Sequence, residues 1–501
     1  MTETTLLSPD EFARAMEQHY IEASDDARKV IVGLQEQSND AEIYSRYAHL
    51  YTTDQLASLA DARDAATDPA TRETLRRLWF DAADAVAAQD LVQAAQDLMN
   101  DRLSWRTTWD GQDVSINDLN ARLTADADFD RREQIYERIC EADEHFATRD
   151  LELAVKSSQI RSEIFGYDGE VAIANARTGI DIAAFSDDVQ RVAAETSELY
   201  DAACDASFPA LLGREVTLPS RAHAGWIRSL HEFDSIYTRE RMADVCNATL
   251  AELGFPLDRI PTILPDLEDR PQKDPRACVI PTRVPEEVHL VVRPTGGLTD
   301  YQAFLHEAGH ALHYGLADAS LPFTMRYTSP DYALTEIYSY VVERITHNPL
   351  WHMRHFGVDE ATAQRVCNLT RFVDHSLFRR YGAKLAYELE FWANPADPRN
   401  PERYAMLLSH ATNMGYPTSS FVSDMDPGLY AADYLRAWRT SEQVIAWMTD
   451  EYGEEWFCNG QAAPFLRELF HQGTGPTNED VLARVHATPS DFTALIQAIE
   501  Q

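Results

Sequence analysis

Hydrophobic residues recur at intervals of three and four from Ser8 to about Arg214, as in the series Leu75, Leu78, Trp79 and Ala82. This spacing places apolar side chains on one face of a helix, so it predicts a long series of amphipathic helices. The periodicity is interrupted once, where an Asp110-Gly111 turn separates two short β-prone runs. Such a turn predicts a small hairpin over residues 104–116.

The pattern changes after residue 214. Residues 215–295 are richer in proline and less periodic, and residues 288–293 form the best strand candidate. This run leads directly into Gly296-Gly297, after which the helical periodicity returns and continues to the end of the chain. The whole pattern predicts a mainly α protein with one small β patch. A strand in this position could pair with an extended peptide, or it could serve only for packing.

One stretch of the predicted helices carries candidate chemistry. His306-Glu307-Ala308-Gly309-His310 is an H-E-x-x-H motif within a helix expected over residues 300–314, with Thr299 and Gln302 as its capping box. The spacing of four residues stacks two imidazoles on one helix face, where both can reach one metal ion. The alternative is two histidines buried in an ordinary core helix.

Catalytic zinc usually takes three protein ligands and keeps one position for water, so a third ligand is needed. His313 lies one turn beyond His310, but three ligands from one short helix rarely converge. Glu336 is the favoured candidate, because it lies 26 residues after His310 on a helix that could pack against the first. Glu343 shares a helical face with Glu336 and is expected to be a supporting acid behind the ligands.

Glu307 has a separate expected role. Zinc makes water a better nucleophile near neutral pH, and a carboxylate within hydrogen-bond reach can take the proton as a carbonyl carbon is attacked. The position of Glu307 beside the first ligand suits a general base.

The composition of the chain limits the kinds of partner that it can bind. The 501 residues carry a formal net charge of −38, which repels nucleic acids and anionic membrane surfaces. The sequence has no apolar run long enough to span a bilayer and no secretory signal at its start, so a cytoplasmic location is expected. Six cysteines lack any C-x-x-C spacing and are expected to be reduced. The oligomeric state cannot be predicted.

The segments 296–313 and 336–343 together resemble the thimet oligopeptidase and oligoendopeptidase F family of zinc metallopeptidases. The resemblance implies a large, two-lobed helical zincin-type metallopeptidase with a deep cleft, one Zn²⁺ per chain and short peptides as substrates. Residues 1–214 would form an N-terminal helical lobe roofing the cleft, and residues 215–501 the catalytic lobe.

The same family has a late run of tyrosines that stabilise the oxyanion of the transition state. Residues 428–438 resemble this run, which makes Tyr430 and Tyr434 candidates for that role. Met425 and Ala437 depart from the family pattern, where a histidine and a further tyrosine are usual. The alternative is that both tyrosines are core aromatics of an amphipathic helix.

Other functions stay open on the sequence alone. Arg436 could pair with Glu343 in a structural salt bridge, the favoured reading, or it could bind a substrate carboxylate. The second role would suit a metallocarboxypeptidase or a hydrolase devoted to one amide-containing metabolite. A non-catalytic binding scaffold that retains the peptidase shell is the third reading.

Overall fold

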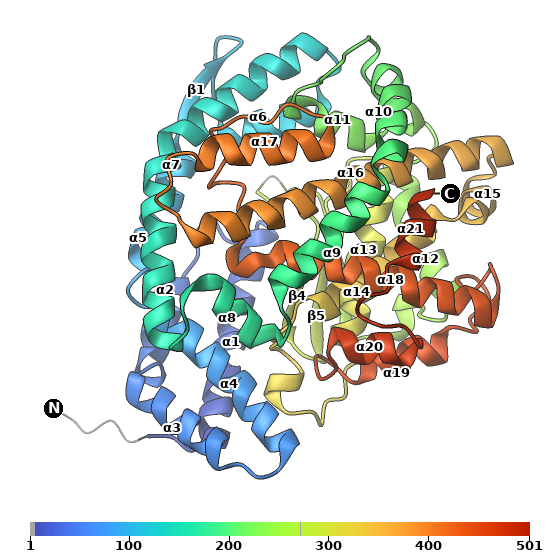
Figure 1. Cartoon of the computed structure of the whole chain (residues 1–501). Helices are drawn as coiled ribbons and strands as arrows, with labels where there is room; N and C mark the ends of the chain where they lie inside the picture. Colours follow the sequence, from blue (N-terminus) through green and yellow to red (C-terminus); the bar gives the residue numbers. More distant parts are fainter. Residues whose placement is uncertain (1–5, 271, 501) are drawn as a thin grey trace. The chain divides into compact units, whose positions relative to one another are not determined.

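The protein is described by a computed structural model that covers residues 6–270 and 272–500. Most of these residues are helical, and the strands are few and short, which confirms the mainly α prediction (Figure 1). The cleft implied by the family resemblance stays a prediction.

The chain forms two compact units, and each is assembled from separate stretches of sequence. The first unit comprises residues up to 86 together with 235–358 and 436–494, and the second comprises 87–234, 359–435 and the residues from 495 onward. The expected N-terminal lobe of residues 1–214 and catalytic lobe of residues 215–501 stay predictions, because helical periodicity reports which face of a helix is buried and not which distant segments share a core.

The elements of the first unit are α1 (Pro9–Ile31), α2 (Asp40–Tyr47), α3 (Thr53–Ala65), α12 (Arg239–Leu253), β3 (Ile263–Asp266), β4 (Cys278–Arg283), β5 (Glu287–Val291), α13 (Leu298–Gly315), α14 (Ala333–Glu343), α15 (Pro349–Phe356), α19 (Ala463–His471) and α20 (Asn478–Arg484). The elements of the second unit are α5 (Val92–Ser104), β1 (Arg106–Trp109), β2 (Gln112–Ser115), α6 (Ile116–Ala125), α7 (Phe129–Phe165), α8 (Gly169–Thr178), α9 (Ile182–Glu195), α10 (Ser197–Leu212), α11 (Ala224–Ser229), α16 (Glu360–Ala393) and α17 (Asn400–Thr412). Three helices continue across a unit boundary: α4 (Pro69–Ala88), α18 (Tyr430–Tyr452) and α21 (Thr493–Glu500).

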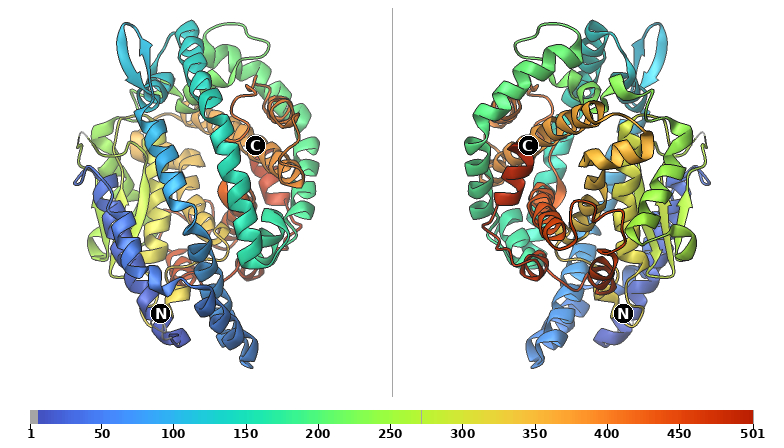
Figure 2. Two further views of the ribbon diagram at one scale, coloured as in Figure 1. Left: turned by 90° about the vertical axis from the view of Figure 1, so that its left-hand side faces the viewer. Right: turned by 90° about the vertical axis from the view of Figure 1, so that its right-hand side faces the viewer.

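The strand expected at 288–293 is confirmed as β5, at Glu287–Val291. The strand order is β3-β5-β4, with β5 parallel to β3 and antiparallel to β4. Helix α13 contacts both β4 and β5, and α1 packs against β4 (Figure 2). Because β5 is central, both of its edges are already hydrogen-bonded. Of the two roles left open for this strand, pairing with a peptide is therefore wrong, and packing is the role that the sheet order supports.

The predicted hairpin is confirmed as the β1–β2 pair, in which Trp109 lies opposite Gln112. Asp110 and Gly111 form the two-residue turn, with φ angles of 50° and 73°. Two successive positive φ angles are typical of the tight turns that suit the twist of a hairpin, and they favour the Asp-Gly pair found here.

Among the described residues, no helix is both long and apolar enough to cross a membrane. All six cysteines are free thiols, as expected from their spacing.

Candidate metal centre

Helix α13 carries the H-E-x-x-H motif and runs from Leu298 to Gly315, close to the expected 300–314. Its start differs from the prediction, because the N-cap position is Gly297 and no side chain caps the helix. Instead, the carboxylate of Asp300 accepts hydrogen bonds from the backbone N–H groups of Thr295, at 2.6 Å, and Gly296, at 2.5 Å. The carboxylate of Asp300 holds the turn before the helix. Because no side chain caps the helix, the expected Thr299 capping box is wrong.

A glycine in the motif lets α13 approach α14 closely. A Cβ atom at Gly309 would lie 2.5 Å from the Cα atom of Ser339 and 2.5 Å from the carbonyl oxygen of Tyr338. No side chain fits between the two backbones at this point. The close approach brings the side chain of Glu336, on α14, to the two motif histidines on α13.

Three side chains converge at this contact. The Oε2 atom of Glu336 lies 3.5 Å from Nε2 of His306 and 3.7 Å from Nε2 of His310. Two ligand atoms bound about 2.0–2.1 Å from one tetrahedral zinc ion lie about 3.4 Å apart, so these distances fit a shared metal ion. Within the described part of the chain, this is the one group of three or more metal-binding side chains with ligand atoms this close together.

The far side of each histidine ring is also hydrogen-bonded. Nδ1 of His306 lies 2.7 Å from Oε2 of Glu343, and Nδ1 of His310 lies 2.8 Å from the hydroxyl of Thr335. Partners of this kind orient a ligand histidine and direct the lone pair of Nε2 to the metal. Glu343 thus lies where the sequence placed it, whereas no sequence signal pointed to Thr335 beyond its position next to Glu336.

His313 does not join the three converging residues. Its Nε2 atom lies 2.8 Å from the carbonyl oxygen of Gly473, and the ring is fully buried. Burial lowers the pKa of this imidazole to about 4, so the ring is neutral near neutral pH. The geometry excludes His313 as the third ligand.

Burial and neighbouring charges set the protonation of the site. Burial lowers the pKa of His310 to about 3. Burial also lowers the pKa of His306, but hydrogen bonds and charges from Glu336 and Glu343 outweigh it and raise the pKa overall. For Glu307, burial raises the pKa to about 7, with a further contribution from the charge of Glu336. A bound dication would lower the pKa of each of these groups.

Strand β4 passes beside Glu307. The backbone N–H of Val279 favours the charged form of this carboxylate, and the charge of Glu307, after burial, helps to raise the pKa of the Cys278 thiol to about 12. No sequence pattern pointed to either residue, because the strand was expected in the neighbouring segment.

Tyr430 and Tyr434 lie in the first turns of α18, with ring centroids 4.8 Å apart in an edge-to-face arrangement. The ring of Tyr434 also lies 5.1 Å from that of Tyr381. Both candidate tyrosines belong to the second unit, whereas the metal-binding group belongs to the first. Their oxyanion role therefore stays a prediction.

Arg436 forms structural ion pairs, as the sequence analysis favoured, but the expected pairing with Glu343 is wrong. The guanidinium is 1% exposed and forms ion pairs with Asp331, at 2.8 Å, and with Glu479, at 3.0 Å. Glu343 is bonded to His306 instead. With its charge already paired inside the first unit, Arg436 is a poor candidate for binding a substrate carboxylate.

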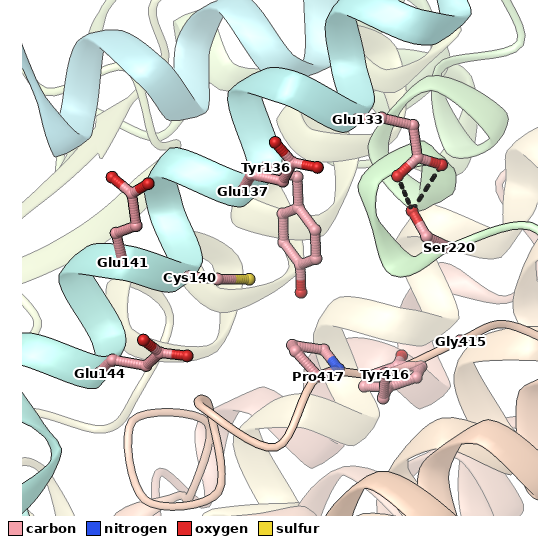
Figure 3. A pocket seen from close by; sticks show the side chains of 10 residues that line it. All are labelled: Glu133, Tyr136, Glu137, Cys140, Glu141, Glu144, Ser220, Gly415, Tyr416 and Pro417. Carbon is pink, nitrogen blue, oxygen red and sulfur yellow. Dashed lines mark hydrogen bonds between the residues drawn. The ribbon is translucent and has the colours of Figure 1, made fainter. Parts of the chain in front are cut away.

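A separate cavity of about 470 Å³ lies in the second unit, beside α7 (Figure 3). Its lining residues are Glu133, Tyr136, Glu137, Cys140, Glu141, Glu144, Ser220, Gly415, Tyr416 and Pro417. In Figure 3 the ring of Tyr136 points across the cavity, and the hydroxyl of Ser220 donates to Glu133 at 2.8 Å. The glutamates disfavour anionic ligands.

The fold is that of the large helical zincin-type peptidases. A protein from Bacillus anthracis strain Ames that is assigned as an oligoendopeptidase F has a similar structure. The TM-score is 0.65, with 15% identity over 97% of this chain and 88% of that one. A carboxypeptidase from Pyrococcus furiosus is similar with a TM-score of 0.62 and 13% identity over 99% of both chains. The M32 carboxypeptidase from Deinococcus radiodurans R1 has a TM-score of 0.61 and 14% identity over 98% of both chains. The sequence itself matches no protein-family model and none of the curated proteins compared with it.

Proposed function

We propose that the protein is a zinc-dependent peptidase that hydrolyses peptide bonds in short peptides. The observation that carries the proposal is the convergence of His306, His310 and Glu336 on one point, with Glu307 on the same helix as the two histidines. Two imidazoles and one carboxylate form a ligand set that zinc uses in hydrolytic sites, where one position stays open. One zinc ion per chain is expected.

Zinc in such a ligand set polarises a carbonyl group and makes water a stronger nucleophile near neutral pH. Glu307 then acts as the general base: its carboxylate takes a proton from the water as the water oxygen attacks the carbonyl carbon. The same carboxyl group returns the proton to the nitrogen of the leaving amine as the C–N bond breaks. The backbone N–H of Val279 supports the charged form of Glu307 that begins this cycle.

We further propose that β4, rather than β5, lies along the bound peptide. β4 is an outer strand of the three-stranded sheet, with β5 on one side, and its residue Val279 lies beside Glu307. An extended peptide could add to the outer edge of such a strand through backbone hydrogen bonds.

Tyr430 and Tyr434 are proposed as donors to the oxyanion of the transition state. Their spacing of four residues places both hydroxyl-bearing rings on one face of α18. Replacing an oxyanion donor typically lowers kcat by about 10²–10³-fold. Tyr430→Phe and Tyr434→Phe, which keep the ring, should show such a loss in at least one case, with little change in zinc content.

A carboxypeptidase is the second candidate, because two proteins of similar fold are described as carboxypeptidases. A pair of peptides that differ only in a free or amidated C-terminus discriminates the two activities. An oligopeptidase that cuts internal bonds should cleave both peptides, whereas a carboxypeptidase should cleave only the free acid.

The test of the proposed function is mass spectrometry of a mixed pool of short peptides after incubation with the protein. We expect cleavage that stops with a chelator and returns when zinc is added back. The positions of the cuts, within the peptide or at its C-terminus, distinguish an oligopeptidase that cuts internal bonds from a carboxypeptidase. A pool that stays intact with the zinc-loaded protein would favour the metabolite hydrolase or the non-catalytic scaffold.

A further inference from the structure

His313 is the one histidine of the motif helix that the proposed chemistry leaves unused. It is fully buried one turn beyond His310, and its Nε2 atom lies 2.8 Å from the carbonyl oxygen of Gly473. A carbonyl oxygen can only accept a hydrogen bond, so Nε2 of His313 carries the proton. In a neutral ring, Nδ1 of His313 is then an acceptor.

The hydroxyl of Thr335 lies between the two histidines. It is 3.3 Å from Nδ1 of His313 and 2.8 Å from Nδ1 of His310. A hydroxyl has one proton to donate, and the acceptor at His313 favours its donation there. The oxygen of Thr335 then accepts from His310, which places the proton of His310 on Nδ1. The backbone carbonyl of Thr335 also favours a proton on the ring of His310, and the hydroxyl of Thr335 also lies against the phenol of Tyr314.

We propose that His313 and Thr335 are positioning residues that fix the tautomer of His310 through a hydrogen-bond relay. The relay runs from Nδ1 of His310 to Thr335, then to His313, and ends at the carbonyl of Gly473. It leaves Nε2 of His310 without a proton, facing Glu336, as a metal ligand must be. This inference rests on the proposed function only in taking the three converging residues as a metal site.

The reverse direction is unfavourable. If Thr335 donated to Nδ1 of His310, Nδ1 of His313 would either be left without a donor or carry its own proton, which requires a buried imidazolium. The proton of His310 would then sit on Nε2, where it would point at the metal position. Either outcome for His313 costs free energy in a buried site, so this arrangement is disfavoured.

The carbonyl of Gly473, at the end of the relay, is held in place by contacts of Gly473 and the next residue. Gly473 has a φ of 55°, and a Cβ atom there would overlap the carbonyl oxygen of Met325. The next residue, Thr474, donates its backbone N–H to Met325 at 2.9 Å and its hydroxyl to the carbonyl of Thr328 at 2.7 Å. Arg77 of α4 donates to the carbonyl of Thr474 at 2.6 Å. The carbonyl of Gly473 is therefore a fixed acceptor.

The two ligand histidines are thus oriented differently. His306 is held by the carboxylate of Glu343, whereas His310 is held by a neutral hydroxyl whose direction depends on a second histidine. A hydroxyl alone could donate or accept, so His313 adds to the directional information that the backbone carbonyl of Thr335 gives to the ring of His310.

The first test is the tautomer of His310 in the metal-free wild-type protein, read from ¹⁵N chemical shifts after selective histidine labelling, with His310→Gln used for assignment. We expect the proton on Nδ1. In Thr335→Val, which removes the hydroxyl and keeps the side-chain shape, we expect the two tautomers to mix. A proton on Nε2 in the wild type would overturn the relay, and this measurement needs no variant to bind metal.

The second test is the zinc dissociation constant, measured by competition with a chromogenic chelator. Thr335→Val and His313→Leu should each weaken zinc binding by about 10–100-fold, as is typical for residues behind a metal ligand. Thr335→Ser, which keeps the hydroxyl, should retain most of the affinity. The double variant should be no weaker than the single ones, because either change breaks the same chain.

The outcomes separate the two proposals. A wild-type protein that does not bind zinc would contradict the proposed function, while the tautomer measurement would still test the relay. Wild-type zinc binding with undiminished affinity in both Thr335→Val and His313→Leu, or with fully additive losses, would contradict the relay alone.

Discussion

Nδ1 of His306, on α13, lies 2.7 Å from Oε2 of Glu343, the last residue of α14. Glu336, seven residues earlier on α14, faces the other nitrogen of the same ring. One helix therefore supplies both a proposed metal ligand and the carboxylate that orients a second proposed ligand. The relative position of α13 and α14 decides whether the site can form.

Glu343→Leu should weaken zinc binding by about 10–100-fold, because His306 loses the acceptor that orients it. Glu343→Gln keeps an acceptor oxygen without the charge, so its loss should be smaller. The measurement is chelator competition, with Glu402→Gln on the exposed face of α17 as the matched control. Equal affinities in wild type and Glu343→Leu would show that Glu343 does not support the ligand.

Gly309→Ala should both destabilise the first unit and weaken zinc binding. The added methyl would lie 2.5 Å from the Cα atom of Ser339, so α13 and α14 must separate. Overpacking of this kind typically costs about 1–3 kcal/mol, and the separation would also move Glu336. The free energy of unfolding and the zinc content of the purified protein are the readouts.

Gly415→Ala is the control for this change, since an added Cβ there meets only the Cα atom of Ser220 at 3.9 Å. The two glycine variants should therefore differ clearly. Normal stability and full zinc content in Gly309→Ala would show that the helices do not need their close contact.

Arg436→Met should destabilise the protein without changing its preference for a free C-terminus. Removing the guanidinium leaves Asp331, whose side chain is 4% exposed, without its cation. Breaking a buried pair in this way costs about 3–5 kcal/mol. Arg276→Met, at a side chain that is 85% exposed, should cost at most about 1 kcal/mol. Selective loss of cleavage of free-acid peptides in Arg436→Met would instead place this arginine at the substrate.

Glu388 should make the stability of the second unit fall as pH rises. Complete burial raises its pKa from 4.5 to about 8, despite the nearby charge of Lys384. Between these values the folded protein holds a proton that the unfolded chain has released, so stability declines from about pH 4.5 to pH 8 and stays lower above that.

Glu388→Gln mimics the protonated group and should remove this decline. Thermal unfolding midpoints at pH 5 and pH 9 provide the measurement. We expect similar midpoints for wild type and variant at pH 5, and a higher midpoint for the variant at pH 9. A variant less stable than the wild type at pH 9 would mean that the folded protein favours the charged carboxylate.

Local features of this protein could be predicted from its sequence, because they depend on residues close together in the chain. The four-residue spacing of His306 and His310 sets one helix face, and the Asp110-Gly111 pair sets a hairpin turn. Glu336 could be predicted from the same helical periodicity, because the helix that carries it was expected to pack against the motif helix.

Features that depend on distant contacts could not be predicted. The strand order that makes β5 central is set by pairing with β3 and β4, and nothing in the sequence of β5 reports its neighbours. The partners of Arg436 lie 105 and 43 residues away, on segments whose approach no periodicity reveals. His313 likewise has its acceptor 160 residues away, which is why the sequence offered it only as a weak third ligand.

The central claim is that Glu307 is the base of a zinc-dependent hydrolysis, and Glu307→Gln tests it most directly. The substitution keeps the size and polarity of the side chain but removes its ability to take a proton from water. We expect one zinc ion per chain by elemental analysis, as in the wild type, together with a loss of peptide cleavage of at least about 10²-fold. A variant that holds zinc and cleaves the peptide pool at the wild-type rate would contradict the claim.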